Sequence, residues 1–141
     1  MFHLNIASLG LHKDEMIAAI SLTEVEFDII AISETKIIKN QEPTFDITLP
    51  GYKEYLTPTE SSKGGVLIYI KDSIVVKRRK DLESKMYEAG NLESVFLEIM
   101  NDKKKNEIFG CIYRHPTMDL KTFNENYFND VIAKITDEKK T

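Results

Sequence analysis

Apolar and polar residues follow three different patterns along the first quarter of the chain. Residues 2–9 alternate between apolar and polar side chains, which predicts a strand with one buried face. Residues 15–24 carry an apolar stripe at helical spacing, and Asp14 is a candidate cap for the start of that helix. Residues 27–33 are almost continuously apolar and β-branched, as in a strand buried on both faces. Strand, helix and strand in this order predict a βαβ unit with parallel strands.

Two predicted hairpins occupy the middle of the chain. Residues 64–71 would pair with 75–79, and residues 93–100 would pair with 107–114, each across a polar turn. Residues 36–63, which precede both hairpins, are polar with turn signals and little periodicity, so they predict a long loop.

A last helix is predicted from a capping box. The box is formed by Thr122 and Glu125, and the helix runs to about residue 136 with apolar side chains along one stripe. No further strand follows this helix in the sequence. That ending is unusual for an α/β domain, because a helix packed on a sheet normally leads back into the sheet.

Composition narrows the class of protein. With 141 residues, 42% hydrophobic and 30% charged, the chain is expected to form one domain over residues 1–141. Cys111 is the single cysteine, which excludes an intramolecular disulfide and predicts a reducing, intracellular setting. The amino-terminal residues lack the basic start of a secretory signal, and no run approaches the ~18 apolar residues of a membrane span. We therefore expect no membrane partner.

The charge distribution gives little support to a nucleic-acid surface. The net charge is −4, whereas domains that bind a phosphate backbone usually carry a basic footprint. Residues 77–80 are four consecutive basic residues, and residues 103–105 are three lysines. The second group is best interpreted as a solvated turn, while the first is either a turn or a phosphate patch.

An acidic residue ends the buried strand of residues 27–33. Glu34 lies at the carboxyl end of that strand, and Asn5 lies within the preceding one. Ligands of open α/β sheets collect at this end of the strands. Two interpretations stay open on spacing alone: a strand-end acid hydrogen-bonded to nearby amides, or a ligand of a hydrated Mg²⁺ that also binds substrate phosphate.

A second candidate group follows the last predicted strand. Tyr113, Arg114 and His115 precede Pro116, which marks where the chain leaves the sheet. A phenol, a guanidinium and an imidazole together are suited to holding an anion, and arginine offers a bidentate fork to phosphate. The alternative is an ordinary strand end with Tyr113 half buried and Arg114 in solvent.

Several short motifs occur here in one order, and together they closely resemble a known family. The motifs are LNIASL at 4–9, FDIIAISETK at 27–36, GY at 51–52, KGGVLIYIK at 63–71, LESVFLEI at 92–99 and IFGCIYRHP at 108–116. This order resembles the endonuclease domain of non-LTR (LINE-type) retrotransposons, a branch of the endonuclease/exonuclease/phosphatase superfamily. The resemblance covers nearly the whole chain. It implies an α/β fold with a mixed sheet and flanking helices.

The resemblance also implies a set of catalytic residues. Asn5 matches the asparagine of the first strand, and Glu34 matches the glutamate that holds Mg²⁺, or Mn²⁺ in its place. Tyr113 matches the tyrosine that approaches the scissile phosphate, and Arg114 belongs to the same motif as a phosphate-binding residue. We expect Asn5, Glu34 and Tyr113 to converge on one edge of the sheet. The family reaction is metal-assisted hydrolysis of a DNA phosphodiester, which nicks the target site for retrotransposition.

This chain departs from the family pattern in two ways. Many relatives carry a polar residue where Ala7 stands here. More seriously, the sequence ends before the GDFN motif and the later Asp-His pair of the family. The chain is therefore expected to be roughly the first half of the four-layer α/β sandwich and inactive alone, because general base catalysis contributes about 10²- to 10⁴-fold. DNA, a carboxy-terminal half of the domain and a nuclear location are expected for the complete protein.

A half-domain would also be expected to self-associate. If the second half normally covers one inner face, apolar side chains of the central strands would meet water; these are Val66, Ile68, Val95, Leu97 and Ile108. Two alternative functions stay open. One is a catalytically dead remnant that acts as a binding or structural module, and the other is a superfamily phosphatase acting on small phosphoesters.

Overall fold

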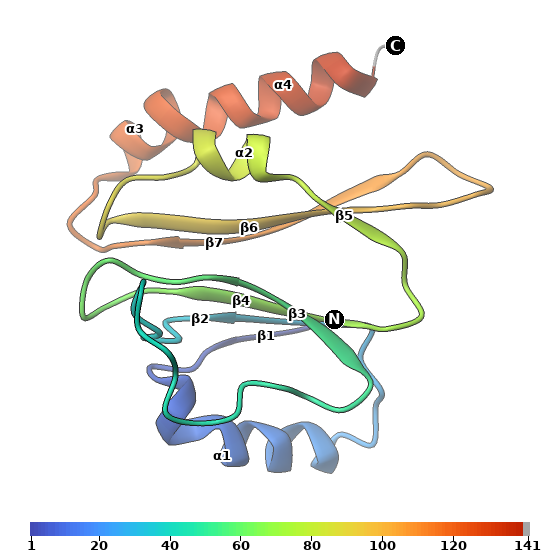
Figure 1. Cartoon of the computed structure of the whole chain (residues 1–141). Coiled ribbons are helices and arrows are strands. Elements are labelled where there is room, and N and C mark those ends of the chain that lie inside the picture. Colours follow the sequence, from blue (N-terminus) through green and yellow to red (C-terminus); the bar gives the residue numbers. More distant parts are fainter. Residues whose placement is uncertain (140–141) are drawn as a thin grey trace.

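Two β-sheets pack face to face, with helices on both outer surfaces (Figure 1). The computed structural model describes residues 1–139. The first sheet has the order β1-β2-β4-β3, with strands Phe2–Asn5 (β1), Ile29–Ser33 (β2), Val66–Lys71 (β4) and Tyr52–Thr57 (β3). The second sheet has the order β5-β6-β7, with strands Val76–Arg78 (β5), Leu92–Ile99 (β6) and Glu107–Arg114 (β7). The expected α/β class, with a mixed sheet and flanking helices, is confirmed.

The predicted βαβ unit is present. Strands β1 and β2 pair in parallel, and helix α1 (Leu9–Leu22) joins them across the outer face of the first sheet (Figure 1). The prediction that Asp14 caps this helix is wrong. The helix begins at Leu9, and the hydroxyl of Ser8 accepts the Leu11 N–H at 3.4 Å. Leu9 is fully buried against the sheet, so the first turn is fixed by packing that periodicity alone did not show.

The predicted pairing of residues 64–71 with 75–79 is wrong. Strand β4 pairs with β2 and β3, whereas β5 pairs with β6 in the other sheet. Ile74 and Val76 pack into the core between the sheets, and this packing carries the chain from one sheet to the other. Strand β3 lies within the region predicted to be a loop. Its charged residues Lys53 and Glu54 interrupt the apolar alternation, as is common in edge strands.

The second hairpin, β6 with β7, is confirmed, and three helices and a π-helical turn cover its outer face. These elements are α2 (Lys80–Lys85), α3 (Leu120–Phe123), a π-helical turn (Asn124–Phe128) and α4 (Asn129–Lys139). The predicted capping box is replaced by Asp119, whose carboxylate accepts the Thr122 N–H at 2.9 Å. None of the helices within residues 1–139 is long and apolar enough to span a bilayer.

The inner faces of the two sheets cover each other. Val66, Ile68, Val95 and Leu97 are fully buried in one cluster, and Ile108 is half buried against the helices on the outer face. The expectation that these side chains meet water is therefore wrong. It failed because strands of both sheets lie within this part of the chain, so the described residues close their own core.

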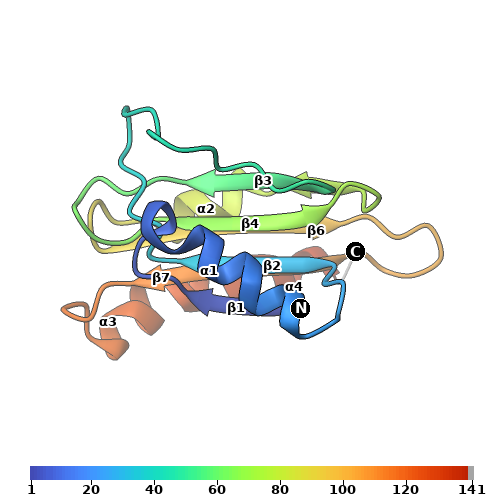
Figure 2. The ribbon, with the colours of Figure 1, turned by 90° about the horizontal axis from the view of Figure 1, so that it is seen from below.

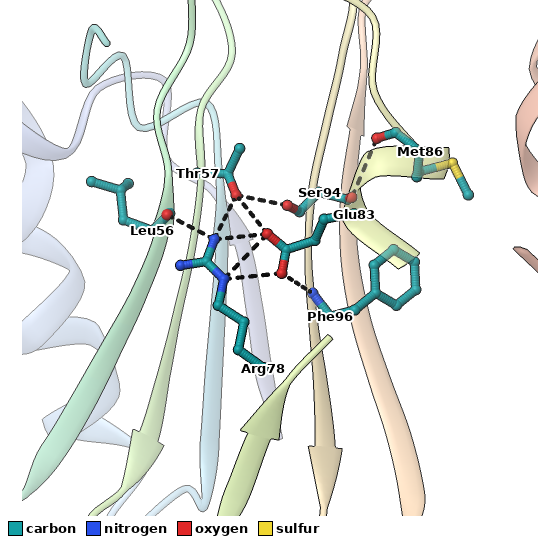
Figure 3. A network of polar contacts seen from close by, with 7 residues as sticks. All are labelled: Leu56, Thr57, Arg78, Glu83, Met86, Ser94 and Phe96. Atoms are coloured by element: carbon teal, nitrogen blue, oxygen red, sulfur yellow. Dashed lines mark hydrogen bonds and ion pairs between the residues drawn. The ribbon is translucent and has the colours of Figure 1, made fainter. Parts of the chain in front are cut away.

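Along one long side, polar side chains join the two sheets (Figure 3). The Arg78 guanidinium donates to the Leu56 carbonyl and to the Thr57 hydroxyl, each at 2.9 Å, and these acceptors belong to β3. It also pairs with the Glu83 carboxylate of α2 through Nε at 3.0 Å and Nη2 at 2.8 Å. The Thr57 hydroxyl donates to the Ser94 carbonyl of β6 at 2.7 Å. We call this the closed side.

The opposite long side carries the edge strands β1 and β7 (Figure 2). A groove of about 200 Å³ runs between them, and it is lined by Met1, His3, Ala31, Phe109, Gly110, Cys111 and Ile112. Each of the two strands has one sheet neighbour within the described residues. We call this the open side.

Candidate active site

Glu34 follows β2 directly and is presented by a strained turn. Both Glu34 and Lys36 have left-handed backbone angles, with φ of 57° and 56°. Non-glycine residues persist there only when the surroundings hold them. The Thr35 N–H donates to the Gly65 carbonyl at 3.2 Å, and the Lys36 N–H donates to the Gly64 carbonyl at 2.9 Å. The turn is therefore fixed by the residues that lead into β4.

Gly64 and Gly65 are required by close approach as well as by backbone angle. Their φ values are 90° and 89°. A Cβ on Gly64 would lie 2.6 Å from Glu93 Oε2 and 2.9 Å from the Tyr113 ring, and a Cβ on Gly65 would lie 2.3 Å from the Thr35 hydroxyl. The backbone of these two residues passes through a space in which no side chain would fit. The absence of side chains allows the first sheet to approach the end of β7.

Tyr113 reaches the same place from the second sheet. Its side chain points inward from β7 and is buried. Glu34 and Tyr113 line one open cavity of about 360 Å³, together with Lys36, Lys63, His115 and Pro116. The two residues expected to meet thus line a common cavity. They do so across the end of the sandwich, from two sheets, rather than along the edge of a single sheet.

The phenol of Tyr113 is set up as a hydrogen-bond donor. Burial raises its pKa, and the negative charges of Glu34 and Glu93 raise it further. The phenol therefore keeps its proton at neutral pH. A protonated phenol can donate a hydrogen bond to a phosphate oxygen, which a second carboxylate in its place could not do. Lys36 and Lys63 on the rim add positive charge that attracts phosphate.

Glu93 is a further acidic residue at this end of the sandwich that the sequence did not single out. It lies opposite Tyr113 in the β6–β7 register, is 1% exposed, and accepts the Gly65 N–H at 3.3 Å through Oε2. Its Oε1 atom has no hydrogen-bond partner within the described residues. Burial raises the pKa of Glu93, and the Gly65 N–H that donates to Oε2 offsets part of that rise. Its signal was a glutamate at an inward-facing position of an apolar strand.

Asn5 lies close to Glu34 in the sheet but outside this cavity. It is opposite Ser33 in the β1–β2 register, its side chain is exposed, and its side-chain oxygen Oδ1 accepts the Ala7 N–H at 3.2 Å. It lines a different depression, together with His12 and residues of α1. The structure therefore places Asn5 beside the turn of Glu34 without bringing it to Tyr113.

Arg114 lies away from the cavity as well. Residues alternate along β7, so Arg114 points to the opposite face from Tyr113, and its guanidinium donates to the Met118 carbonyl. The basic side chains that do line the cavity are Lys36, Lys63 and His115. Sequence reasoning did not assign the two lysines, although Lys36 follows the SET motif and Lys63 precedes the paired glycines.

The residues present suit a metal that is shared with substrate. Within residues 1–139, no three His, Cys, Asp or Glu side chains are grouped to hold a metal ion. Glu34 is the one carboxylate among the residues that line the cavity. Mg²⁺ is often bound by one or two carboxylates while it keeps several waters and takes substrate phosphate oxygens. Glu34 fits that role, and a metal cage made of protein side chains alone is not formed here.

Comparison with known proteins bears on the fold. No family model and no curated protein matches the chain. The crystal structure of the Xenopus laevis APE2 catalytic domain is similar, with a TM-score of 0.56 and 16% identity. The match covers 94% of this chain and 54% of that one, so this chain spans about half the length of that structure. At this identity the likeness establishes the fold alone: two sheets and flanking helices of the endonuclease/exonuclease/phosphatase type.

Proposed function

We propose that this chain is the amino-terminal part of a Mg²⁺-dependent DNA endonuclease of the non-LTR retrotransposon type. The observation that carries the proposal is the shared cavity of Glu34 and Tyr113, which reach it from different sheets. The ordered motifs of the sequence support the retrotransposon branch. The fold shared with the APE2 catalytic domain supports a relationship to nucleases in the broader sense.

The residues of the cavity suggest a division of labour. Glu34 would hold Mg²⁺, or Mn²⁺, which supplies charge stabilisation to the oxygens of a bound phosphodiester. Tyr113, protonated at neutral pH, would donate to a phosphate oxygen. Lys36 and Lys63 would attract the DNA backbone to the rim of the cavity.

The two predicted site residues outside the cavity would act more indirectly. Asn5 would support the Glu34 turn from the neighbouring strand β1. Arg114 would hold the segment after β7 through the Met118 carbonyl, which keeps His115 at the rim of the cavity.

The complete enzyme would need further polypeptide. This chain spans about half of the matched APE2 structure, and the cavity contains one carboxylate. We infer that a carboxy-terminal half of the domain supplies the missing acidic ligand and the general base. That half would add to the open side between β1 and β7, and the assembled protein would act on nuclear DNA.

Binding of a divalent ion gives a direct test of the site. We expect Mn²⁺ to broaden the backbone amide NMR signals of Glu34 and Tyr113 before those of other residues, because the ion relaxes nearby nuclei. Glu34→Gln should remove this selective broadening. Glu107→Gln, which changes an exposed acid at the far end of β7, should leave it intact. Uniform broadening in the unmodified chain would count against a metal site at Glu34.

Cleavage of supercoiled plasmid tests the expectation of inactivity. With Mg²⁺ present, we expect the 141-residue chain to give no nicking above background, because the general base and the second acidic ligand are proposed to lie elsewhere. Nicking that disappears in Glu34→Ala would contradict this expectation and would make the chain a nuclease by itself.

A second function is favoured by the basic rim of the same cavity. One carboxylate and three basic side chains suit the binding of a phosphodiester without its cleavage. A binding module would shift the Lys36 and Lys63 signals on addition of a short DNA duplex, with or without Mg²⁺. The proposed nuclease half should show a stronger shift with Mg²⁺ than without it.

A further inference from the structure

Glu93 occupies a position that a purely structural side chain would not favour. It is 1% exposed in the core, and one of its carboxylate oxygens has no hydrogen-bond partner within the described residues. Burying a polar atom without a partner is unfavourable, and an apolar side chain of the same length would avoid that cost. The cost is concentrated at one end of the sandwich, directly behind the candidate active site.

A continuous set of contacts leads from Glu93 to Glu34. Glu93 Oε2 accepts the Gly65 N–H at 3.3 Å. The carbonyls of Gly65 and Gly64 in turn accept the N–H groups of Thr35 and Lys36, the two residues that follow Glu34, at 3.2 and 2.9 Å. The glycines therefore connect the second sheet to the turn that presents the candidate metal ligand.

The same carboxylate lies near the ring of Tyr113. The site of a Cβ on Gly64 is 2.6 Å from Glu93 Oε2 and 2.9 Å from Tyr113 Cε1, so the carboxylate and the ring both lie next to this glycine. Glu93 and Tyr113 are also direct partners in the β6–β7 register. Glu93 thus touches both halves of the site: the glycines that hold the Glu34 turn, and the strand that carries the phenol.

We propose that Glu93 is a positioning residue of the candidate active site, whose buried carboxyl group anchors Gly65 and thereby holds the left-handed turn of Glu34 next to Tyr113. The role of Glu93 in an active site rests on the proposed function, whereas its effect on the Glu34 turn can be tested separately. The competing interpretation is that Glu93 is an ordinary core residue whose removal affects the whole fold equally.

Three variants separate these interpretations. Glu93→Met has nearly the same length but no acceptor, and it removes the buried carboxyl group. Glu93→Gln keeps an oxygen that can accept the Gly65 N–H. Ser94→Ala is the matched control, because Ser94 is also buried on β6 but its hydroxyl donates to the Met86 carbonyl on the opposite face, at 3.3 Å.

The first readout is the amide NMR spectrum, which needs no activity. We expect Glu93→Met to stay folded while the amide signals of Gly65, Thr35 and Lys36 shift and their hydrogen exchange accelerates. Both Glu93→Gln and Ser94→Ala should keep the chemical shifts and hydrogen-exchange rates that these amides have in the unmodified chain. Native signals for the turn in Glu93→Met would overturn the proposal. Loss of all dispersed signals in Glu93→Met would also overturn it, because Glu93 would then hold the whole core.

The second readout is Mn²⁺ itself. The Mn²⁺ concentration that half-broadens the Glu34 amide signal should rise by roughly 10-fold or more in Glu93→Met and stay within about twofold in Glu93→Gln, as for residues that orient metal ligands. An unchanged Mn²⁺ response in Glu93→Met would overturn the positioning role. If the unmodified chain shows no selective broadening, the proposed metal site fails, and the amide spectra still decide the role of Glu93.

Discussion

The two long sides of the sandwich differ in what lies between the edge strands of the two sheets. On the closed side, Arg78 bonds to a carbonyl and a hydroxyl of β3 and to the carboxylate of Glu83, so one guanidinium joins three elements (Figure 3). On the open side, the edge strands are β1 and β7 (Figure 2). They face a groove of about 200 Å³ with a mainly apolar lining. The closed side is joined by polar side chains of this chain, whereas the open side presents sheet edges.

This difference indicates that the closed side is completed by side chains of the described residues, whereas the open side could accept further strands. A strand edge presents unpaired N–H and C=O groups that can accept another strand, and nothing comparable to Arg78 crosses the groove among the residues that line it. The candidate active site lies at one end of the sandwich, where both sheets contribute. A segment that extended both sheets from β1 and β7 would pass beside that end, which is the arrangement that the proposed second half of the domain requires.

The largest expected effect is loss of the closed side. Arg78→Met removes the guanidinium that donates to the Glu83 carboxylate and to the Leu56 carbonyl in a half-buried place. We expect the free energy of unfolding to fall by about 2–4 kcal/mol, measured by urea denaturation with circular dichroism. Lys77→Met, an exposed substitution on the same strand, is the matched control and should change it by less than about 0.5 kcal/mol. Equal effects of the two variants would mean that the contacts of Arg78 stabilise the fold no more than an exposed side chain does.

A second prediction concerns Arg79, which points to the opposite face from Arg78 and is almost fully buried. Its guanidinium donates to Asp81 at 2.9 and 2.8 Å and to Glu98 at 3.1 Å. The hydrogen bond from Arg79 lowers the pKa of Asp81, while Asn106 and then Arg79 lower the pKa of Glu98. Because the folded pKa values lie below the unfolded ones, the stabilisation is present above about pH 4 and is lost as the pH falls through the folded values.

The measurement is the difference in unfolding free energy between the unmodified chain and Arg79→Met at several pH values. After allowance for the partial exposure of Asp81, we expect the part of this difference that depends on pH to be about 1–2 kcal/mol. It should shrink between pH 5 and pH 2. A difference that stays constant over this range would show that Arg79 stabilises by packing alone.

Much of the fold could be predicted from local pattern. The apolar run of β2, its parallel pairing with β1 and the β6–β7 hairpin all follow from periodicity. The pattern could not show which sheet a strand joins. The segment from β4 to β5 has the sequence of a hairpin, yet packing of Ile74 between the sheets separates the two strands. Burial of a short connecting segment is a tertiary effect, which spacing along the chain does not encode.

The candidate site shows the same limit. Glu34 and Tyr113 could be predicted because each lies at the end of a predicted strand, and the structure places both at one cavity. The side chains of Lys36, Lys63 and Glu93 were not assigned, because their positions depend on the approach of Gly64 and Gly65 to a second sheet. Motif order can locate the residues that carry chemistry, but the residues that hold them in place emerge only from contacts between sheets.

The smallest expected effect on the fold comes from a probe of the open side. Cys111 lines the groove from β7 and is 5% exposed, and burial raises the pKa of its thiol to about 11. Since the thiolate is the reactive form, alkylation by iodoacetamide at pH 8 should be about 100-fold slower in the folded chain than in urea. The matched control is Ser73→Cys in a Cys111→Ala background, which places a thiol in an exposed turn and should react at the unfolded rate. Alkylation of native Cys111 as fast as this control would mean that the open side separates readily, and the contrast with the closed side would then be one of stability as well as of bonding.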